Sequence, residues 1–169
     1  MNSSNRTRKL AMAGLLTAIA VVGGMFSIPI GAAKCSPVQH MVNVIAAVLL
    51  GPWYAVGSAF VTSLIRNLIG TGSLLAFPGS MVGALLAGLL YQRIQRLPAA
   101  FAGEVFGTGI LGAMLSYPIA VQLMGKTSAL FAFVPSFLLN TVAGSIVAVL
   151  VICALSRTGA LKSLRLSLR

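Results

Sequence analysis

Long apolar stretches separated by short polar or basic segments make up most of the chain. Each helical crossing of a bilayer needs about 20 apolar residues. By this criterion, six candidate spans follow one another: about residues 9–27, 37–50, 53–70, 79–95, 99–124 and 130–156. The second is short for a perpendicular crossing, and Gly51 and Pro52 separate it sharply from the third. The pattern predicts an all-α membrane protein, a six-transmembrane-helix bundle.

Composition agrees with this pattern. Hydrophobic residues make up 58% of the chain and charged residues only 8%, and the mean hydropathy is +1.00. With 169 residues we expect a single integral membrane domain over 1–169, with short basic tails at about 1–8 and 157–169. A basic start followed by an apolar stretch could also be a signal peptide, but about 17 apolar residues are long for one. We therefore expect this segment to remain as the first helix.

The net charge of +11 comes from 12 Lys and Arg residues against one acid, Glu104. Such a charge could indicate nucleic-acid binding, but these basic residues lie in clusters between apolar stretches, which excludes that function. Six crossings place nine of them on the side of both termini: Arg6, Arg8, Lys9, Arg93, Arg96, Arg157, Lys162, Arg165 and Arg169. Lys34 and Lys126 fall on the other side, with Arg66 near it. The positive-inside rule then predicts that both termini are cytoplasmic.

Polar residues gather at the start of the second span, in "GAAKCSPVQHMVN" at residues 31–43. His40, the only histidine, and Asn43 are one helical turn apart on one face. Ser36, Pro37 and Gln39 fit a helix start with a serine cap, so capping is an alternative role for Gln39. His40 could likewise be a solvated interfacial side chain.

Other polar residues are expected at the same depth of the membrane: Arg66, Asn67, Tyr117, Gln122, Asn140 and Thr141. Because polar groups are costly in lipid, we expect them to face the bundle interior and to line a cavity. Two simpler explanations remain open. Arg66 could extend to the outer surface, and Asn140 and Thr141 could form only interhelical hydrogen bonds.

Glu104 is expected near the cytoplasmic end of the fifth span, where pairing with Arg93 or Arg96 is favoured over contact with a substrate. Small residues recur at spacing four in the fourth span and the fifth span. They are Gly79, Gly83 and Ala87 in one, and Gly103 and Gly107 in the other. Such faces predict close helix packing.

No enzyme signature is present in the sequence. The chain has no aspartate, one His and one Glu, which excludes a Ser-His-Asp triad and a catalytic metal site. Cys35 and Cys153 lack metal-ligand spacing and are expected to be free thiols. The two GTG triplets lack the strand and helix context of a phosphate-binding loop. We therefore predict no catalytic residues, no metal and no cofactor, and any uphill transport would take its energy from a partner.

Four stretches resemble a known family: "AAKCSPVQHMVNV", "LLGPWYA", "RNLIGTGSLLAFPGSMVGALLAGLLY" and "GEVFGTGILGAMLSYPIA". They look like the substrate-binding S component of energy-coupling factor (ECF) transporters, in the thiazole subfamily ThiW. The resemblance covers about residues 8–156. It implies a prokaryotic multi-pass protein of the cell membrane, with six helices and cytoplasmic termini. It also implies capture of a thiamine precursor, hydroxyethylthiazole, for ATP-driven uptake.

The resemblance also implies partners, namely a transmembrane scaffold subunit and two cytoplasmic ATPase subunits. In the family the scaffold contacts small residues of the first helix, commonly alanines four apart. This chain offers Gly14 and Ala18, with Ala11 one turn earlier.

For the substrate we predict a site with Gln39, His40 and Asn43 on one wall and Arg66 and Asn67 opposite. Tyr117 is expected to stack on the ligand ring, and Asn140 to lie at the same depth. Three alternatives stay open: a stand-alone secondary carrier of a small heteroaromatic solute, an S component for another vitamin, and a ligand-free structural subunit of a membrane complex.

Overall fold

Helices account for nearly all of the chain in a computed structural model that describes residues 3–26, 28–30, 33–125, 127 and 129–168. Helix α1 (Ser3–Met25) leads into a hairpin of β1 (Ile28–Ile30) and β2 (Ala33–Cys35). Next come α2 (Pro37–Leu50), α3 (Pro52–Leu68) and α4 (Ala76–Ile94). A continuous helical segment then joins α5 (Leu97–Phe106), the π-helix η1 (Gly107–Gly112), α6 (Ala113–Pro118) and the π-helix η2 (Ile119–Leu123). The last two helices are α7 (Val134–Arg157) and α8 (Ala160–Ser167).

Each of the six predicted spans coincides with one of these helical segments, and α2 has the predicted bounds of 37–50. Among the residues that the structure describes, three helices are long and apolar enough to cross a membrane: Asn5–Met25, Leu97–Leu123 and Val134–Arg157. Two elements were not predicted. One is the antiparallel hairpin, in which Ile28 pairs with Cys35. The other is α8, which occupies the expected C-terminal tail.

The cation Arg165 makes one of the contacts that hold helix α8 against the bundle. The Arg165 guanidinium donates to the Tyr91 hydroxyl of α4, and its central carbon lies 5.7 Å from the centre of the Tyr91 ring. Gly159, in the left-handed conformation at φ 74°, provides the turn between α7 and α8. This interaction explains why a short basic segment forms a docked helix instead of a free tail.

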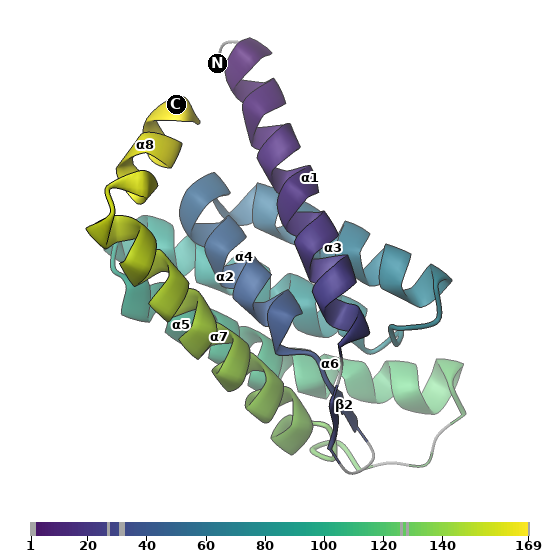
Figure 1. The fold of residues 1–169 in the computed structure, drawn as a ribbon. Helices are drawn as coiled ribbons and strands as arrows, with labels where there is room; N and C mark the ends of the chain where they lie inside the picture. The colour runs from purple at the N-terminus through teal and green to yellow at the C-terminus, as the bar shows by residue number, and fades with distance from the viewer. Residues whose placement is uncertain (1–2, 27, 31–32, 126, 128, 169) are drawn as a thin grey trace.

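The two chain termini lie at the same end of the molecule (Figure 1). Arg8 of α1 donates to the Ser167 carbonyl of α8 over 3.2 Å. The turn between α2 and α3 and the end of α4 meet there, around a small cavity that includes Lys9, Gly51 and Gln92. The predicted grouping of the termini with these two connections therefore agrees with the fold.

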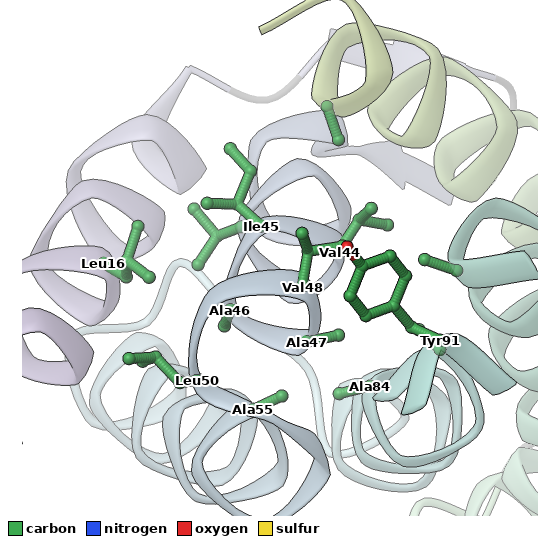
Figure 2. Close-up of a cluster of buried hydrophobic side chains, with 14 of the residues drawn as sticks. Leu16, Val44, Ile45, Ala46, Ala47, Val48, Leu50, Ala55, Ala84 and Tyr91 are labelled. Carbon is green, nitrogen blue, oxygen red and sulfur yellow. The ribbon is translucent and has the colours of Figure 1, made fainter. Parts of the chain in front are cut away.

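Helix α2 forms the centre of the bundle. Figure 2 shows its residues Val44 to Val48 surrounded by side chains of other helices, among them Leu16 of α1, Ala55 of α3 and Ala84 and Tyr91 of α4. Residues 42–48 are all buried. A helix that is apolar on all sides packs well when other helices surround it. The polar first turn of α2 thereby comes to the end of the bundle opposite the termini.

Glycines bring α4 into close contact with the segment that follows Leu97. A Cβ atom added to Gly103 would lie 2.6 Å from the Ala87 backbone, and one on Gly107 would lie 2.7 Å from Gly83. Further along, the added Cβ of Gly112 would lie 2.5 Å from Gly79. These separations leave no room for a side chain, so the predicted close packing of these small-residue faces is confirmed.

Candidate functional site

A cavity of about 520 Å³ lies at the end of the bundle that carries the hairpin, within the range of small-molecule sites. The first turn of α2, the end of α3 and the start of α7 contribute side chains to it, together with residues 71–76 and Ser80 of α4. Five of the seven predicted substrate-binding residues line it: Gln39, His40, Arg66, Asn67 and Asn140. Residues from distant parts of the sequence thus meet around one cavity, and their role in substrate binding stays a prediction.

Gln39 and Arg66 form a buried pair in this wall, with relative exposures of 3% and 6%. The Gln39 Oε1 accepts from the Arg66 Nη1, and the Gln39 Nε2 donates to the Ser63 Oγ over 3.1 Å. The Arg66 Nη2 donates to the carbonyls of Gly24, at 3.3 Å, and Thr71, at 3.2 Å. Arg66 therefore faces inward, as predicted, and does not extend to the outer surface.

The capping role considered for Gln39 is wrong. Helix α2 does begin at Pro37 after Ser36, but no side-chain capping bond forms there. The backbone N–H of Ser36 donates instead to the Asn140 Oδ1 on α7. Because that N–H already has an acceptor, Gln39 is free to bond with the charged Arg66, which forms stronger hydrogen bonds than a neutral donor.

Glu104, the one acid of the chain, forms an ion pair with His40. Arg66 therefore has no acidic side chain as a partner among the described residues. Three of its five N–H groups are committed to neutral oxygens. Room for the guanidinium depends on Gly24 of α1, because a Cβ added there would lie 2.5 Å from the Arg66 Nε. The cavity wall thus contains a buried cation held in place by amide and carbonyl oxygens.

Two asparagines fix the other parts of the wall. The Asn67 Nδ2 donates to the carbonyls of Ser63, at 2.8 Å, and Ser73, at 3.1 Å, which fastens the loop after α3. The Asn140 Nδ2 donates to the Ser136 carbonyl at 2.8 Å, while its Oδ1 accepts from Ser36. Asn140 therefore does form an interhelical link, and it also borders the cavity.

Below the cavity, the only acid and the only histidine of the chain meet. Glu104 is 0% exposed, and its Oε1 lies 2.9 Å from the His40 Nδ1. The Asn43 Nδ2 and the Thr108 Oγ1 each lie 3.0 Å from the same oxygen. The prediction that Glu104 pairs with Arg93 or Arg96 is wrong. Its side chain points into the bundle towards α2, whereas both arginines are exposed.

Some predicted residues lie outside the cavity lining. Asn43 is buried beneath it, bonded to Glu104 and to the Ser80 carbonyl at 3.2 Å. Tyr117 is half-buried and does not border the cavity, so ligand stacking by Tyr117 is not expected from this arrangement. Gln122 is exposed and does not face inward as predicted. The Thr141 hydroxyl is buried without a hydrogen-bond partner in the described part of the chain.

The π-helical segments η1 and η2 explain the misplaced residues of the fifth span. A π turn inserts a residue into the helical repeat and rotates the side chains that follow. Tyr117 and Gln122 were predicted from their depth in the membrane alone, and depth does not reveal this rotation of the helical face.

Sequence reasoning missed the aromatic part of the wall. Phe133 and Phe137 line the cavity, with ring centroids 6.5 Å apart. Their spacing of four residues around Pro135 was the available signal. It also missed the pairing of Glu104 with His40, although a lone acid and a lone histidine within membrane spans are natural partners.

The predicted docking residues of α1 are all exposed. Ala11, Gly14 and Ala18 face away from the bundle, and a Cβ added to Gly14 would meet nothing within 4 Å. Their surroundings are apolar, with Leu15 and Ile19 exposed beside them. The position suits a contact with another membrane protein, and the docking role stays a prediction.

The remaining predictions concern isolated residues. Cys153 is exposed with a free thiol. The side chains of Lys34 and Cys35 lie outside the described part of the structure, and so does Lys126.

Comparisons with known proteins agree with these observations. A family model described as "Thiamine-precursor transporter protein (ThiW)" matches residues 10–158. A search of curated proteins finds no match. Among solved structures, the S component of a bacterial ECF transporter is similar in fold, with a TM-score of 0.75 and 20% sequence identity. The alignment covers 90% of this chain and 98% of that one.

Proposed function

The chain belongs to the ThiW family of thiamine-precursor transporters, and from this premise we propose that it is the substrate-binding S component of an ECF transporter that captures hydroxyethylthiazole. Family membership makes it a multi-pass membrane protein of a prokaryotic cell, and a transporter instead of an enzyme. The proposal adds the specific substrate, the partners and the orientation in the membrane.

The observation that supports the substrate most directly is the cavity itself. A small neutral heteroaromatic ligand requires an apolar enclosure with a few directed hydrogen bonds. Phe133 and Phe137 provide aromatic surface, and Arg66, Asn67 and His40 provide polar groups around the same space. Since Glu104 is already bonded to His40, no free carboxylate faces the ligand in the described lining.

The proposed orientation is six crossings with both termini in the cytoplasm: α1, α2, α3, α4, the segment Leu97–Leu123, and α7. The basic residues near the termini support it, because positive charge is retained on the cytoplasmic side. At 14 residues, α2 is about 21 Å long. Because α2 lies at the centre of the bundle, its first turn can lie below the outer surface of the membrane. The cavity then occupies the space between this turn and that surface. The cavity then opens outward, and residues 1–169 form one integral membrane domain.

The proposed partners are a transmembrane scaffold subunit and two cytoplasmic ATPases. The exposed small residues of α1, namely Ala11, Gly14 and Ala18, are the proposed contact with the scaffold. A helix surface without bulky side chains permits another helix to approach closely. This surface lies on α1, away from the cavity lining, so capture and docking use separate parts of the chain.

The test is a titration of the purified chain with hydroxyethylthiazole, thiamine and the pyrimidine precursor, combined with mass spectrometry of any co-purified molecule. We expect saturable binding of hydroxyethylthiazole at one site. Gln122→Ala provides a matched control, because Gln122 is exposed and outside the cavity. Tighter binding of another vitamin would assign that vitamin as the substrate. Binding of no ligand at all would favour the structural-subunit alternative.

A stand-alone secondary carrier is the second candidate, and Glu104 is the observation in its favour. Proton-coupled carriers commonly use an intramembrane acid beside the substrate site. Glu104 is fully buried and contacts His40, which lines the cavity. Uptake by proteoliposomes that contain this chain alone, driven by a proton gradient and without ATP, would establish the carrier and overturn the ECF proposal.

A further inference from the structure

The two ring nitrogens of His40 have different surroundings. Nδ1 lies 2.9 Å from the Glu104 Oε1. Nε2 makes no hydrogen bond within the described residues. The fully buried polar atoms without a partner in that part of the chain do not include Nε2, so this nitrogen is not sealed off by protein. Because His40 lines the cavity, Nε2 is the nitrogen left accessible to a ligand.

The neighbouring Asn43 shows which way the hydrogen bond at Glu104 runs. The Asn43 Nδ2 lies 3.2 Å from the Ser80 carbonyl, and a carbonyl can only accept. This contact fixes the orientation of the amide, so its second N–H donates to the Glu104 Oε1 at 3.0 Å. The carboxylate form of Glu104 can only accept, so with Glu104 in that form Oε1 accepts from both Asn43 and His40, and the proton of the His40 contact lies on Nδ1.

Packing keeps the Glu104 carboxylate and the His40 ring in this arrangement. A Cβ added to Gly83 would lie 1.9 Å from the Thr108 Oγ1 and 2.7 Å from the Glu104 Oε2. On the other side, a Cβ added to Gly144 would lie 2.8 Å from the His40 Cβ. The close approach of these two backbones limits the movement of the acid and of the ring.

We propose that Glu104 is a positioning residue that holds His40 as the Nδ1–H tautomer, so that Nε2 accepts the hydrogen bond of the substrate's hydroxyl group. A histidine with its proton fixed on Nδ1 presents a lone pair at Nε2. The ring nitrogen of a thiazole is itself only an acceptor and cannot bind there. The hydroxyl of the side chain is the matching donor.

The opposite wall completes this assignment. The Arg66 Nη1 gives one N–H to Gln39, and no hydrogen bond within the described residues uses its second. A guanidinium is a donor only, which suits the thiazole nitrogen. The cavity thus distinguishes the two polar ends of the ligand, with the alcohol at His40 and the ring nitrogen at Arg66. This inference rests on the proposed function.

Because His40 is the only histidine, ¹⁵N-histidine labelling of the full chain reports on this ring alone. In the wild-type protein in detergent or nanodiscs we expect a pyrrole-type signal for Nδ1 and a pyridine-type signal for Nε2. A pyridine-type Nδ1, or pyrrole-type signals for both nitrogens, would overturn the proposal. This measurement needs neither a variant nor a ligand, so it also stands if a Glu104 variant does not fold.

The second measurement compares hydroxyethylthiazole with its 5-ethyl analogue, which lacks the hydroxyl. In the wild type we expect the alcohol to bind about 5-fold to 150-fold more tightly, because the analogue leaves Nε2 unpaired. Glu104→Leu should bring the two affinities together, while Glu104→Gln, whose amide oxygen can still accept from Nδ1, should retain the preference. A general structural defect would instead weaken both ligands in both variants.

Ser116→Ala is the matched control. Ser116 is a buried hydroxyl of the same helical segment, and within the described residues it donates to the carbonyls of Leu75 and Gly112 alone. This variant should keep the wild-type preference for the alcohol. An unchanged preference in Glu104→Leu would overturn the inference while leaving the proposed function intact. Failure of the wild type to bind either thiazole would overturn the proposed function, and the histidine signals would still decide the tautomer.

Discussion

Helices α1 and α2 are neighbours in the bundle and both are apolar, yet they occupy opposite environments. Residues 42–48 of α2 are all buried. In α1, only 22% of the residues in its apolar stretch are buried inside the protein. In a membrane, an apolar surface is equally stable against lipid, so hydrophobicity alone does not determine which helix is central. The polar residues do. Helix α2 contains Gln39, His40 and Asn43, whose hydrogen bonds require partners inside the protein.

The largest expected effect follows from the open face of α1. Gly14→Trp should reduce uptake to background in cells that contain the complete transporter, because the scaffold can no longer approach. Substrate affinity of the purified variant should stay at the wild-type value. Gly57→Trp is the control, since Gly57 is also an exposed helical glycine with nothing within 4 Å of an added Cβ. Equal loss of uptake in both variants would remove the distinction between α1 and other lipid-facing helices.

The next effect concerns the polar turn of α2. His40→Ala should reduce substrate affinity by about 5-fold to 150-fold, which corresponds to about 1–3 kcal/mol for a lost hydrogen bond at a buried site. The comparison is Thr17→Ala, which removes a buried polar group of α1 outside the cavity. Equilibrium titration measures both. Wild-type affinity in His40→Ala would exclude a direct role for His40 in binding.

Gln39→Ala should lower the free energy of unfolding by about 1–3 kcal/mol, because the buried Arg66 loses the acceptor for one N–H. Ser36→Ala separates this explanation from capping. The Ser36 hydroxyl has no hydrogen-bond partner in the described structure, so its removal should leave stability unchanged. A functional cap at this position would instead contribute about 0.5–2 kcal/mol. Thermal or denaturant unfolding in detergent distinguishes the two outcomes.

The smallest effect is expected from Gly14→Ala. The added methyl group meets no atom within 4 Å, and alanine favours a helix over glycine by up to about 1 kcal/mol. Unfolding of the isolated chain should therefore occur at a slightly higher temperature. A lower unfolding temperature would show that α1 packs against the bundle at this position.

Much of this arrangement was predictable from sequence because the membrane imposes simple rules. Helix α2 was predicted with its observed bounds, since Pro37 and the Gly51–Pro52 pair mark its ends. The faces formed by Gly79, Gly83 and Ala87 in α4 and by Gly103 and Gly107 in the next span have a regular spacing that indicates close packing. Because polar groups are costly in lipid, Gln39, Arg66 and Asn140 were predicted to face one cavity. All three line the cavity in the structure.

The predictions that failed depend on interactions that no local pattern contains. The partner of Glu104 is set by the rotation of α5 against α2, and Tyr117 and Gln122 follow a π-helical segment that changes the helical phase. Helix α8 docks through Arg165 and Tyr91, 74 positions apart in the sequence. The hairpin before α2 depends on pairing between two strands of only three residues each.

Ligand protection of single cysteines tests the location of the binding site most directly. With Cys35 and Cys153 replaced by serine, Ser136→Cys places a thiol in the cavity lining at the start of α7. Ser156→Cys places one on the exposed end of the same helix, near the chain termini. Saturating hydroxyethylthiazole should strongly slow maleimide labelling at position 136 and leave labelling at position 156 unchanged. Equal labelling rates at position 136 with and without bound ligand would contradict the assignment of this cavity as the substrate site.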